Sequence, residues 1–196
     1  MSRIPILMYH NVSKQKEDSK GLTISTEKLE EQFQYLKSKG YTSFHLSELE
    51  NLKKIPAKSI VLTFDDVTEN QFINALPLLK KYQLKAVFYI PFFYIGKTDL
   101  WNNGTEKIMT LDQIKSTDLE LVEFGFHSFK HRDYNSLSND EIKADFDACK
   151  QIISENNLKV YPSVAYPYGS YPRKGAENAN FKLQLEKNEI KFGLRI

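Results

Sequence analysis

The sequence predicts an α/β fold built on a parallel sheet, either doubly wound or barrel-shaped. Strand-like and helical segments alternate along the chain, giving about seven strands joined by helical crossovers. Residues 59–64 and 85–90 are continuous apolar runs, which are typical of strands buried on both faces of such a sheet. No glycine-rich phosphate loop follows a strand, so nucleotide-binding folds are disfavoured.

The expected strands cover residues 4–9, 41–45, 59–64, 85–90, 119–126, 162–169 and 190–196. The expected helices cover residues 25–40, 47–52, 76–83, 110–116, 138–157 and 179–189. Ser47, Thr110 and Ser138 each stand three residues before a Glu or Gln, which is the capping-box pattern of a helix start. Residues 97–109, with the only tryptophan of the chain, are expected to form a long surface loop.

The composition is that of one folded domain, expected over residues 1–196. Apolar residues make up 41% and aromatic residues 13%, so the chain can bury a sizeable core. The 27 basic and 25 acidic residues give a net charge of +2, which offers no electrostatic reason to bind nucleic acid. The single cysteine, Cys149, forms no intrachain disulfide, and we interpret it as a half-buried structural residue of its helix.

No apolar run approaches the ~18 residues of a membrane helix. The first residues, MSRIPILMYHNVS, also lack the apolar length and the cleavage site of a secretory leader. As written, the chain is therefore typical of a cytoplasmic protein, although removal of a leader would leave the same sequence. The sequence does not predict an oligomeric state.

Two adjacent carboxylates, Asp65 and Asp66, follow the apolar run at 59–64. In parallel α/β folds the active site is built at the carboxyl ends of strands. Neighbouring carboxylates repel each other there unless a cation or a proton relieves them. A turn or a helix N-cap is the alternative interpretation of the pair.

His127 and His131 follow the expected strand over 119–126. Their i, i+4 spacing puts both imidazoles on one face if the segment is a helical turn. Imidazole binds zinc, iron, nickel or cobalt, and two histidines with one carboxylate recur in catalytic sites that keep open positions. Asp65 or Asp66 can supply the carboxylate. Packing in an aromatic-rich core is the alternative role for the histidines.

The third motif, AYPYGSYP, again ends an expected strand. Pro167 and Gly169 predict a turn. Tyr166, Tyr168 and Tyr171 are candidates to line a sugar groove. A surface turn anchored by tyrosines is the alternative.

Together, TFDD, HSFKH and AYPYG resemble, in this order, the motifs of the polysaccharide deacetylase family, also called the NodB-homology or carbohydrate esterase 4 family. The resemblance covers nearly the whole chain. It implies a distorted (β/α)7-type barrel, the NodB-homology fold. It also implies a divalent metal, usually Zn²⁺, with Co²⁺, Ni²⁺, Fe²⁺ and Mn²⁺ as alternatives.

The resemblance also assigns roles to individual residues. Asp66, His127 and His131 match the metal ligands of the family, and Asp65 matches its general base. Tyr168 matches the position whose backbone N–H helps to form the oxyanion hole.

The sequence departs from the family pattern at three places. Val67 stands where the first motif has glycine, which predicts a different path for the loop. The third motif lacks the arginine that often orients the base. No histidine follows His131, although the family usually carries a histidine acid near the end of the domain.

His10, at the end of the first expected strand, is predicted to supply that acid. This placement resembles the branch that deacetylates poly-N-acetylglucosamine, in which the acid-bearing strand is shifted to the N-terminus. In a closed barrel the first and last strands are neighbours, so either end of the chain can deliver the same side chain. A structural strand-end histidine is the alternative.

The resemblance predicts a metal-dependent deacetylase that acts on an N-acetylglucosamine-containing polysaccharide and releases acetate. One alternative is a deacetylase of another acetylated glycan, such as peptidoglycan, a lipid-linked sugar or an O-acetyl ester. A second is a glycan-binding relative with impaired catalysis, which Val67 and the missing arginine favour slightly. Family members that act on exported glycans are generally secreted or membrane-tethered, so the compartment stays open.

Overall fold

The computed structural model describes residues 4–195 and contains a seven-stranded parallel sheet. The strand order is β1-β5-β6-β7-β8-β9, and β4 pairs with β5 beside this path. The strands are β1 (Ile6–Tyr9), β4 (Thr42–Ser43), β5 (Ser59–Asp65), β6 (Ala86–Ile90), β7 (Val122–Phe126), β8 (Ser163–Ala165) and β9 (Phe192–Leu194). Each of them overlaps a segment that the sequence predicts to be a strand.

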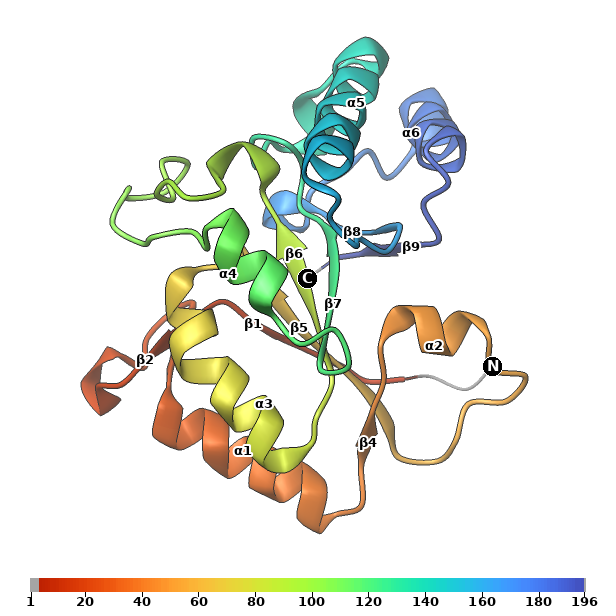
Figure 1. The fold of residues 1–196 in the computed structure, drawn as a ribbon. Coiled ribbons are helices and arrows are strands. Elements are labelled where there is room, and N and C mark those ends of the chain that lie inside the picture. Colours follow the sequence, from red (N-terminus) through yellow and green to blue (C-terminus); the bar gives the residue numbers. More distant parts are fainter. Residues whose placement is uncertain (1–3, 196) are drawn as a thin grey trace.

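The sheet curls into a half-barrel, with helices packed around it (Figure 1). Met8 of β1 and Leu194 of β9 line one inner cavity of about 480 Å³, although these strands are the two ends of the strand order. No strand pairing joins β1 to β9 within residues 4–195. The expectation of a closed barrel with adjacent first and last strands is therefore corrected: the two strands face a common cavity but are not hydrogen-bonded.

The helices are α1 (Thr26–Ser38), α2 (Leu46–Glu50), α3 (Leu76–Tyr82), α4 (Leu111–Ser116), α5 (Asn139–Asn156) and α6 (Gly175–Lys187). Thr110 and Ser138 cap α4 and α5 as predicted. The predicted start of α2 at Ser47 is wrong, because His45 is the N-cap residue. The backbone N–H groups of Leu46 and Ser47 donate to the Glu123 carboxylate of β7, a partner that no local pattern reveals.

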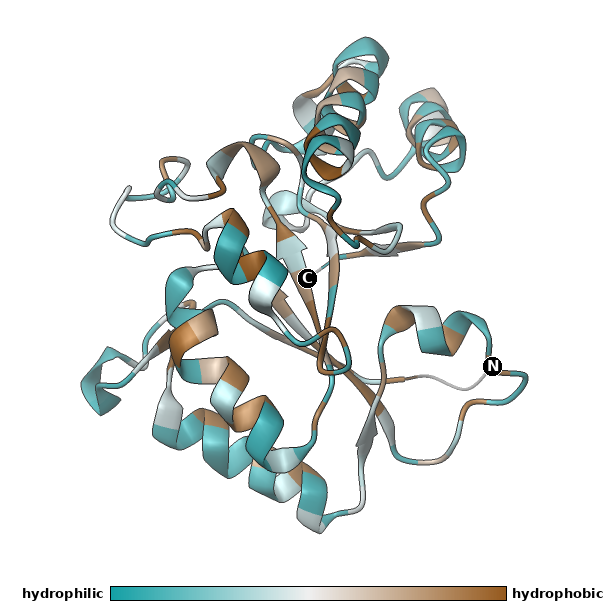
Figure 2. Cartoon of the chain, viewed as in Figure 1, coloured by the Kyte–Doolittle hydropathy of each residue, from teal (hydrophilic) through white to brown (hydrophobic). Residues whose placement is uncertain are grey.

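The two faces of the sheet bury different side chains, because side chains alternate along a strand. In β5, Leu62 and Phe64 pack into the larger apolar cluster, which also contains residues of α1, α3 and α5. Val61 packs with Tyr89 in a smaller cluster on the inner face, where Asp65 also lies. Figure 2 shows the central strands as largely apolar and the helices as apolar on part of their surface only.

Three further elements are too short for the sequence pattern to predict. β2 (Asn11–Ser13) and β3 (Thr23–Ser25) form a separate two-stranded parallel sheet. The π-helical turn η2 (Gln71–Ala75) leads directly into α3. In the described part of the chain, none of the helices has the length and apolar character needed to cross a membrane.

Candidate active site

The carboxyl ends of β1, β5 and β7 lie at one edge of the sheet, and each leads to a predicted site residue. His10 follows β1, Asp65 ends β5, and His127 follows β7. Tyr9 and Phe64 are the last in-register pair of β1 and β5, so His10 and Asp65 come next at the same level. The parallel register thereby gathers residues that are far apart in the sequence.

His10 and Asp65 form a buried pair. His10 Nε2 lies 3.8 Å from Asp65 Oδ2. Burial raises the pKa of the Asp65 carboxyl, and this effect outweighs the nearby His127 and His10, which favour the charged form. A carboxylate whose pKa is raised in this way is a stronger base than an exposed one.

Asp66 meets both histidines of the second motif. Its Oδ1 atom lies 3.4 Å from His127 Nε2 and 3.3 Å from His131 Nε2. Two ligands of a tetrahedral zinc ion, each ~2.0–2.1 Å from the metal, lie about 3.3–3.4 Å apart. Asp66 Oδ1 is also buried without a hydrogen-bond partner among the described residues, and a cation would satisfy it. The three residues therefore fit a metal ion.

The two imidazoles lie in different surroundings. His127 Nδ1 lies 2.9 Å from Ala165 O and donates there, which leaves Nε2 free to face Asp66. Although burial opposes the charge on His127, the neighbouring carboxylates raise its pKa to about 8. Burial lowers the pKa of His131 to about 4. The Trp101 ring stacks on His131, with ring centroids 4.5 Å apart and an interplanar angle of 19°.

The segment between the histidines is not the helical turn that their spacing allows. Residues 127–133 form no helix. Ser128 and His131 have left-handed backbone conformations, with φ of +61° and +52°. A loop, not a helix, therefore brings the two imidazoles together. Because the loop lacks helical hydrogen bonds, side-chain contacts must hold it in place.

Asp145 of α5 provides those contacts. Its carboxylate accepts hydrogen bonds from Ser128 Oγ–H, from the Phe129 N–H and from Tyr134 O–H. Sequence reasoning did not single out Asp145. The available signal is its place among buried apolar residues of the helix, since Phe146 and Cys149 share its buried face.

Val67, which stands where the resembled motif has glycine, has a left-handed backbone conformation. Asp66 and Val67 have φ of +75° and +43°. A β-branched residue is an outlier in this region, and the Val67 side chain is fully buried. The valine therefore occupies a backbone conformation that favours glycine.

A cavity of about 650 Å³ opens over the site. Its lining includes His10, Asp65, Asp66, His127, His131, Trp101 and Tyr168. The centroids of the Tyr168 and His131 rings lie 4.8 Å apart, and Tyr168 is 61% exposed. Tyr166 and Tyr171 instead pack together and against Phe181. Of the three tyrosines predicted to line a groove, only Tyr168 lines this cavity.

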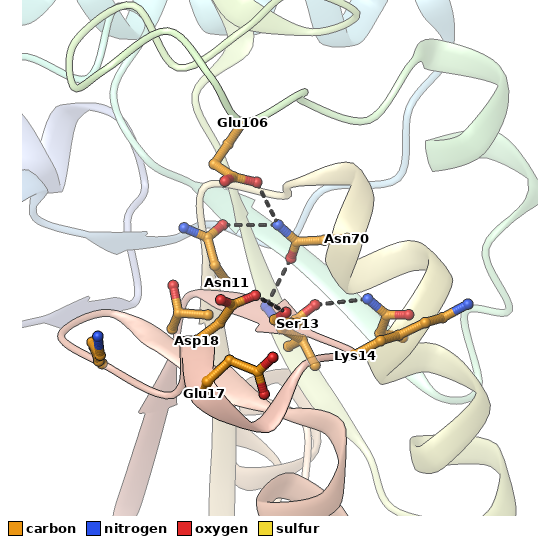
Figure 3. A pocket seen from close by; sticks show the side chains of 11 residues that line it. Asn11, Ser13, Lys14, Glu17, Asp18, Asn70 and Glu106 are labelled. Atoms are coloured by element: carbon orange, nitrogen blue, oxygen red, sulfur yellow. Dashed lines mark hydrogen bonds between the residues drawn. The ribbon is translucent and has the colours of Figure 1, made fainter.

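A second hollow of about 550 Å³ lies beside the first, and Asn11, Thr23 and Glu106 line both. Figure 3 shows its polar wall, in which the Asn70 amide donates to Asn11 Oδ1 and to Glu106 Oε2. The second hollow reaches β2, since Asn11, Val12 and Ser13 line it.

A family model described as polysaccharide deacetylase matches residues 53–184. This chain belongs to the polysaccharide deacetylase family. The match contains all three motifs that the sequence analysis singled out, but it leaves His10 outside. The resemblance inferred from the motifs is thus confirmed, whereas the assignment of His10 depends on the geometry described above.

Relatives with assigned names agree with this membership. A Bacillus subtilis protein named as a polysaccharide deacetylase is 26% identical over 189 residues, which cover 93% of this chain and 63% of that protein. A poly-β-1,6-N-acetyl-D-glucosamine N-deacetylase of Staphylococcus epidermidis is 25% identical over 97% of this chain and 71% of its own length. The chain therefore spans only part of these relatives.

Solved structures show the same fold. The deacetylase PplD of Streptococcus pyogenes, solved with acetate, superposes with a TM-score of 0.78 at 26% identity, over 98% of this chain and 83% of that one. A de-N-acetylase of Aggregatibacter actinomycetemcomitans superposes with a TM-score of 0.80 at 19% identity, over 99% and 88% of the two chains. The predicted NodB-homology fold is confirmed, in the form of a half-barrel.

Proposed function

We propose that this protein is a metal-dependent deacetylase that hydrolyses N-acetyl groups of an N-acetylglucosamine-containing polysaccharide and releases acetate. The observation that carries the proposal is that the two adjacent aspartates have different partners. Asp66 faces the Nε2 atoms of His127 and His131, while Asp65 faces His10. Family membership supports the reaction class. The name of the staphylococcal relatives supports the glycan. We propose residues 1–196 as one catalytic domain.

Asp66, His127 and His131 would hold the metal, with Zn²⁺ as the first candidate and Co²⁺, Ni²⁺, Fe²⁺ or Mn²⁺ as alternatives. When bound, such an ion polarises the acetamide carbonyl and lowers the pKa of a water molecule. The hydrogen bond from His127 Nδ1 to Ala165 O keeps the opposite ring nitrogen available as a ligand.

The residues of the chain perform the proton transfers. Asp65 takes a proton from the water that attacks the acetyl carbon. The Tyr168 backbone N–H donates to the oxyanion of the tetrahedral intermediate. His10 donates a proton to the nitrogen as the C–N bond breaks, which leaves acetate and a free amino sugar. The 3.8 Å separation of His10 and Asp65 lets both act on one acetamide group.

The shape of the site supports an extended glycan as substrate. The cavity of about 650 Å³ and the neighbouring hollow of about 550 Å³ each have the size of a ligand pocket, which is roughly 300–1,000 Å³. Trp101 and Tyr168 offer aromatic surface beside the metal ligands, and the second hollow offers amide and carboxylate groups.

Acetate release from N-acetylated β-1,6-linked glucosamine oligosaccharides tests the proposal, with β-1,4-linked oligosaccharides compared in parallel. Asp65→Asn, Asp66→Ala and His127→Ala should each lower kcat at least ~10²-fold. Asp66→Ala and His127→Ala should also lose stoichiometric metal, whereas Asp65→Asn should keep it. Asp147→Asn is a matched control, since Asp147 lies on the exposed side of α5 and pairs with Lys143.

Each outcome separates the candidate functions. Full activity of Asp65→Asn would overturn its role as base. A metal-loaded parent that binds the oligosaccharide without releasing acetate would favour the glycan-binding relative. Faster release from the β-1,4-linked series would assign a different acetylated glycan.

A further inference from the structure

One buried amide joins β1 and β5 beyond their last paired residues. Tyr9 and Phe64 form the last in-register pair. One position further on, Gln71 Nε2 donates to His10 O at 2.9 Å and to Asp65 O at 2.6 Å. Gln71 is fully buried and belongs to the π-helical turn η2. A single side chain therefore bonds the backbone of both members of the proposed acid and base pair.

The chemistry of this contact requires an amide. An NH₂ group carries two N–H donors on one atom, so it can satisfy two carbonyl groups at once. The opposite orientation would place Gln71 Oε1 against two carbonyl oxygens, which repel it. That Oε1 atom is buried without a hydrogen-bond partner among residues 4–195. The unpaired Oε1 costs free energy, and the two hydrogen bonds from Nε2 offset that cost.

Two further amides on the same segment hold the chain that follows His10. Asn70 Oδ1 accepts from the Val12 N–H at 2.9 Å, and Asn74 Nδ2 donates to Val12 O at 2.7 Å. The Asn70 contacts with the neighbouring loop are visible in Figure 3. Side chains of this segment therefore bond the backbone at His10 and again at Val12. Such turns often occur at functional sites.

We propose that Gln71 is a positioning residue that sets the separation between the His10 imidazole and the Asp65 carboxylate. The inference rests on the proposed function, in which these groups are acid and base. Among residues 4–195, β1 pairs only with β5, and the paired residues end at Tyr9, so this pairing does not reach His10. Gln71 links the backbones of β1 and β5 at the next residue of each, His10 and Asp65. A shift of about 1 Å in a catalytic group can lower the rate ~10²-fold.

Gln71→Met tests the proposal, because it removes both donors and keeps the length of the side chain. We expect kcat to fall ~10- to 100-fold, KM to change less than about twofold, and bound metal to stay at the parental level. In a His10→Ala background, Gln71→Met should cause a smaller further fall in kcat, since one of the two groups that it positions is gone. All rates are compared below the unfolding temperature of each variant.

Asn188→Leu is the matched control. Asn188 is a buried amide that accepts from Lys150 and donates to Gln184 O, away from the site. This change should lower stability and leave kcat unchanged. Parental kcat in Gln71→Met, or an equal fall in the presence and absence of His10, would overturn the proposal. If Gln71→Met does not fold, Gln71→Glu, which keeps the shape but loses at least one donor, takes its place in the same comparisons.

A crystal structure of the Gln71 variant decides the question independently of activity. The distance from His10 Nε2 to Asp65 Oδ2 should exceed the 3.8 Å of the parent. An unchanged distance would overturn the positioning role. A parent without deacetylase activity would contradict the proposed function, and the crystallographic comparison would still decide what Gln71 does.

Discussion

At Val67 the backbone conformation and the burial of the side chain favour different residue types. Its φ of +43° favours glycine, and its fully buried side chain favours a large apolar residue. A strained backbone of this kind costs about 1–3 kcal/mol, and burial of a valine contributes about 1.5–3 kcal/mol. The two effects are of similar size, so the valine is tolerated in a glycine conformation.

Val67→Gly should therefore cost no more free energy of unfolding than Val67→Ala. At an ordinary buried position glycine is worse than alanine by roughly 0.5–1 kcal/mol, but relief of the positive φ offsets that difference here. Val122, which is fully buried in β7, is the matched control, and there glycine should be worse than alanine. Urea unfolding of the four variants measures the differences. If the glycine variant is less stable than the alanine variant by the same free energy at both positions, backbone strain at Val67 is contradicted.

Asp145 is the residue on which the histidine loop depends. In Asp145→Asn the remaining oxygen can still accept from Ser128 and the Phe129 N–H, as Oδ1 does in the parent. The NH₂ group then takes the place of Oδ2 and cannot accept from Tyr134 O–H. We expect a loss of about 1–3 kcal/mol in the free energy of unfolding. If His127 and His131 bind zinc as proposed, zinc affinity should fall about 10- to 100-fold, because Asp145 holds the loop that carries them. Calorimetric titration with zinc measures it, with Asp147→Asn as control, and parental affinity in Asp145→Asn would contradict this role.

At the scale of secondary structure, the neighbours of β7 restrict which residue can stand at Gly125. Gly125 pairs with Tyr89 of β6 and stands two residues before His127. A Cβ atom at this position would lie 2.6 Å from Tyr89 Cε1 and 2.7 Å from Ser163 Oγ. Because the Tyr89 side chain is fully buried, the ring has little room to move.

Gly125→Ala should destabilise the protein by about 1–3 kcal/mol, the usual cost of overpacking a core. Because the strain arises beside His127, acetate release should fall together with stability. Combining Gly125→Ala with Ser163→Gly removes one of the two clashes and should recover part of the loss. Thermal unfolding of the single and double variants measures this. A parental unfolding temperature in Gly125→Ala would show that the inner face of the sheet is less tightly packed than the structure indicates.

The helices and strands could be predicted where local patterns determine them. Ser138 and Thr110 cap their helices because a capping box needs only residues three apart. The same pattern fails at Ser47, whose N–H bonds the distant Glu123. β2 and β3 have three residues each, too few for a period of two to be recognised.

At the scale of the whole molecule, the accessibility of the Cys149 thiol measures whether the core is packed. It lies in the main apolar cluster and is fully buried, which makes it more deeply buried than the sequence suggested. Burial also raises the pKa of its thiol well above the ordinary value, so the reactive thiolate is disfavoured.

A thiol-reactive dye at pH 8 should therefore label the native protein only as fast as the protein unfolds, and should label it fully in guanidinium chloride. Cys149→Ser, which has no other thiol, should stay unlabelled in both conditions and serves as control. Rapid stoichiometric labelling under native conditions would contradict the packing of α5 against the sheet.

The sequence by itself determined the alternation of strands and helices, the three motifs, and hence the family. These features depend on side-chain periodicity and on residue types at short spacing, which neighbouring residues impose on one another. Only the tertiary structure decided that His10 faces Asp65, that Trp101 stacks on His131, and that Asp145 holds the histidine loop. It also revealed Gln71 between β1 and β5. These contacts join residues distant in the chain, and they depend on strand register and packing, which the core as a whole selects.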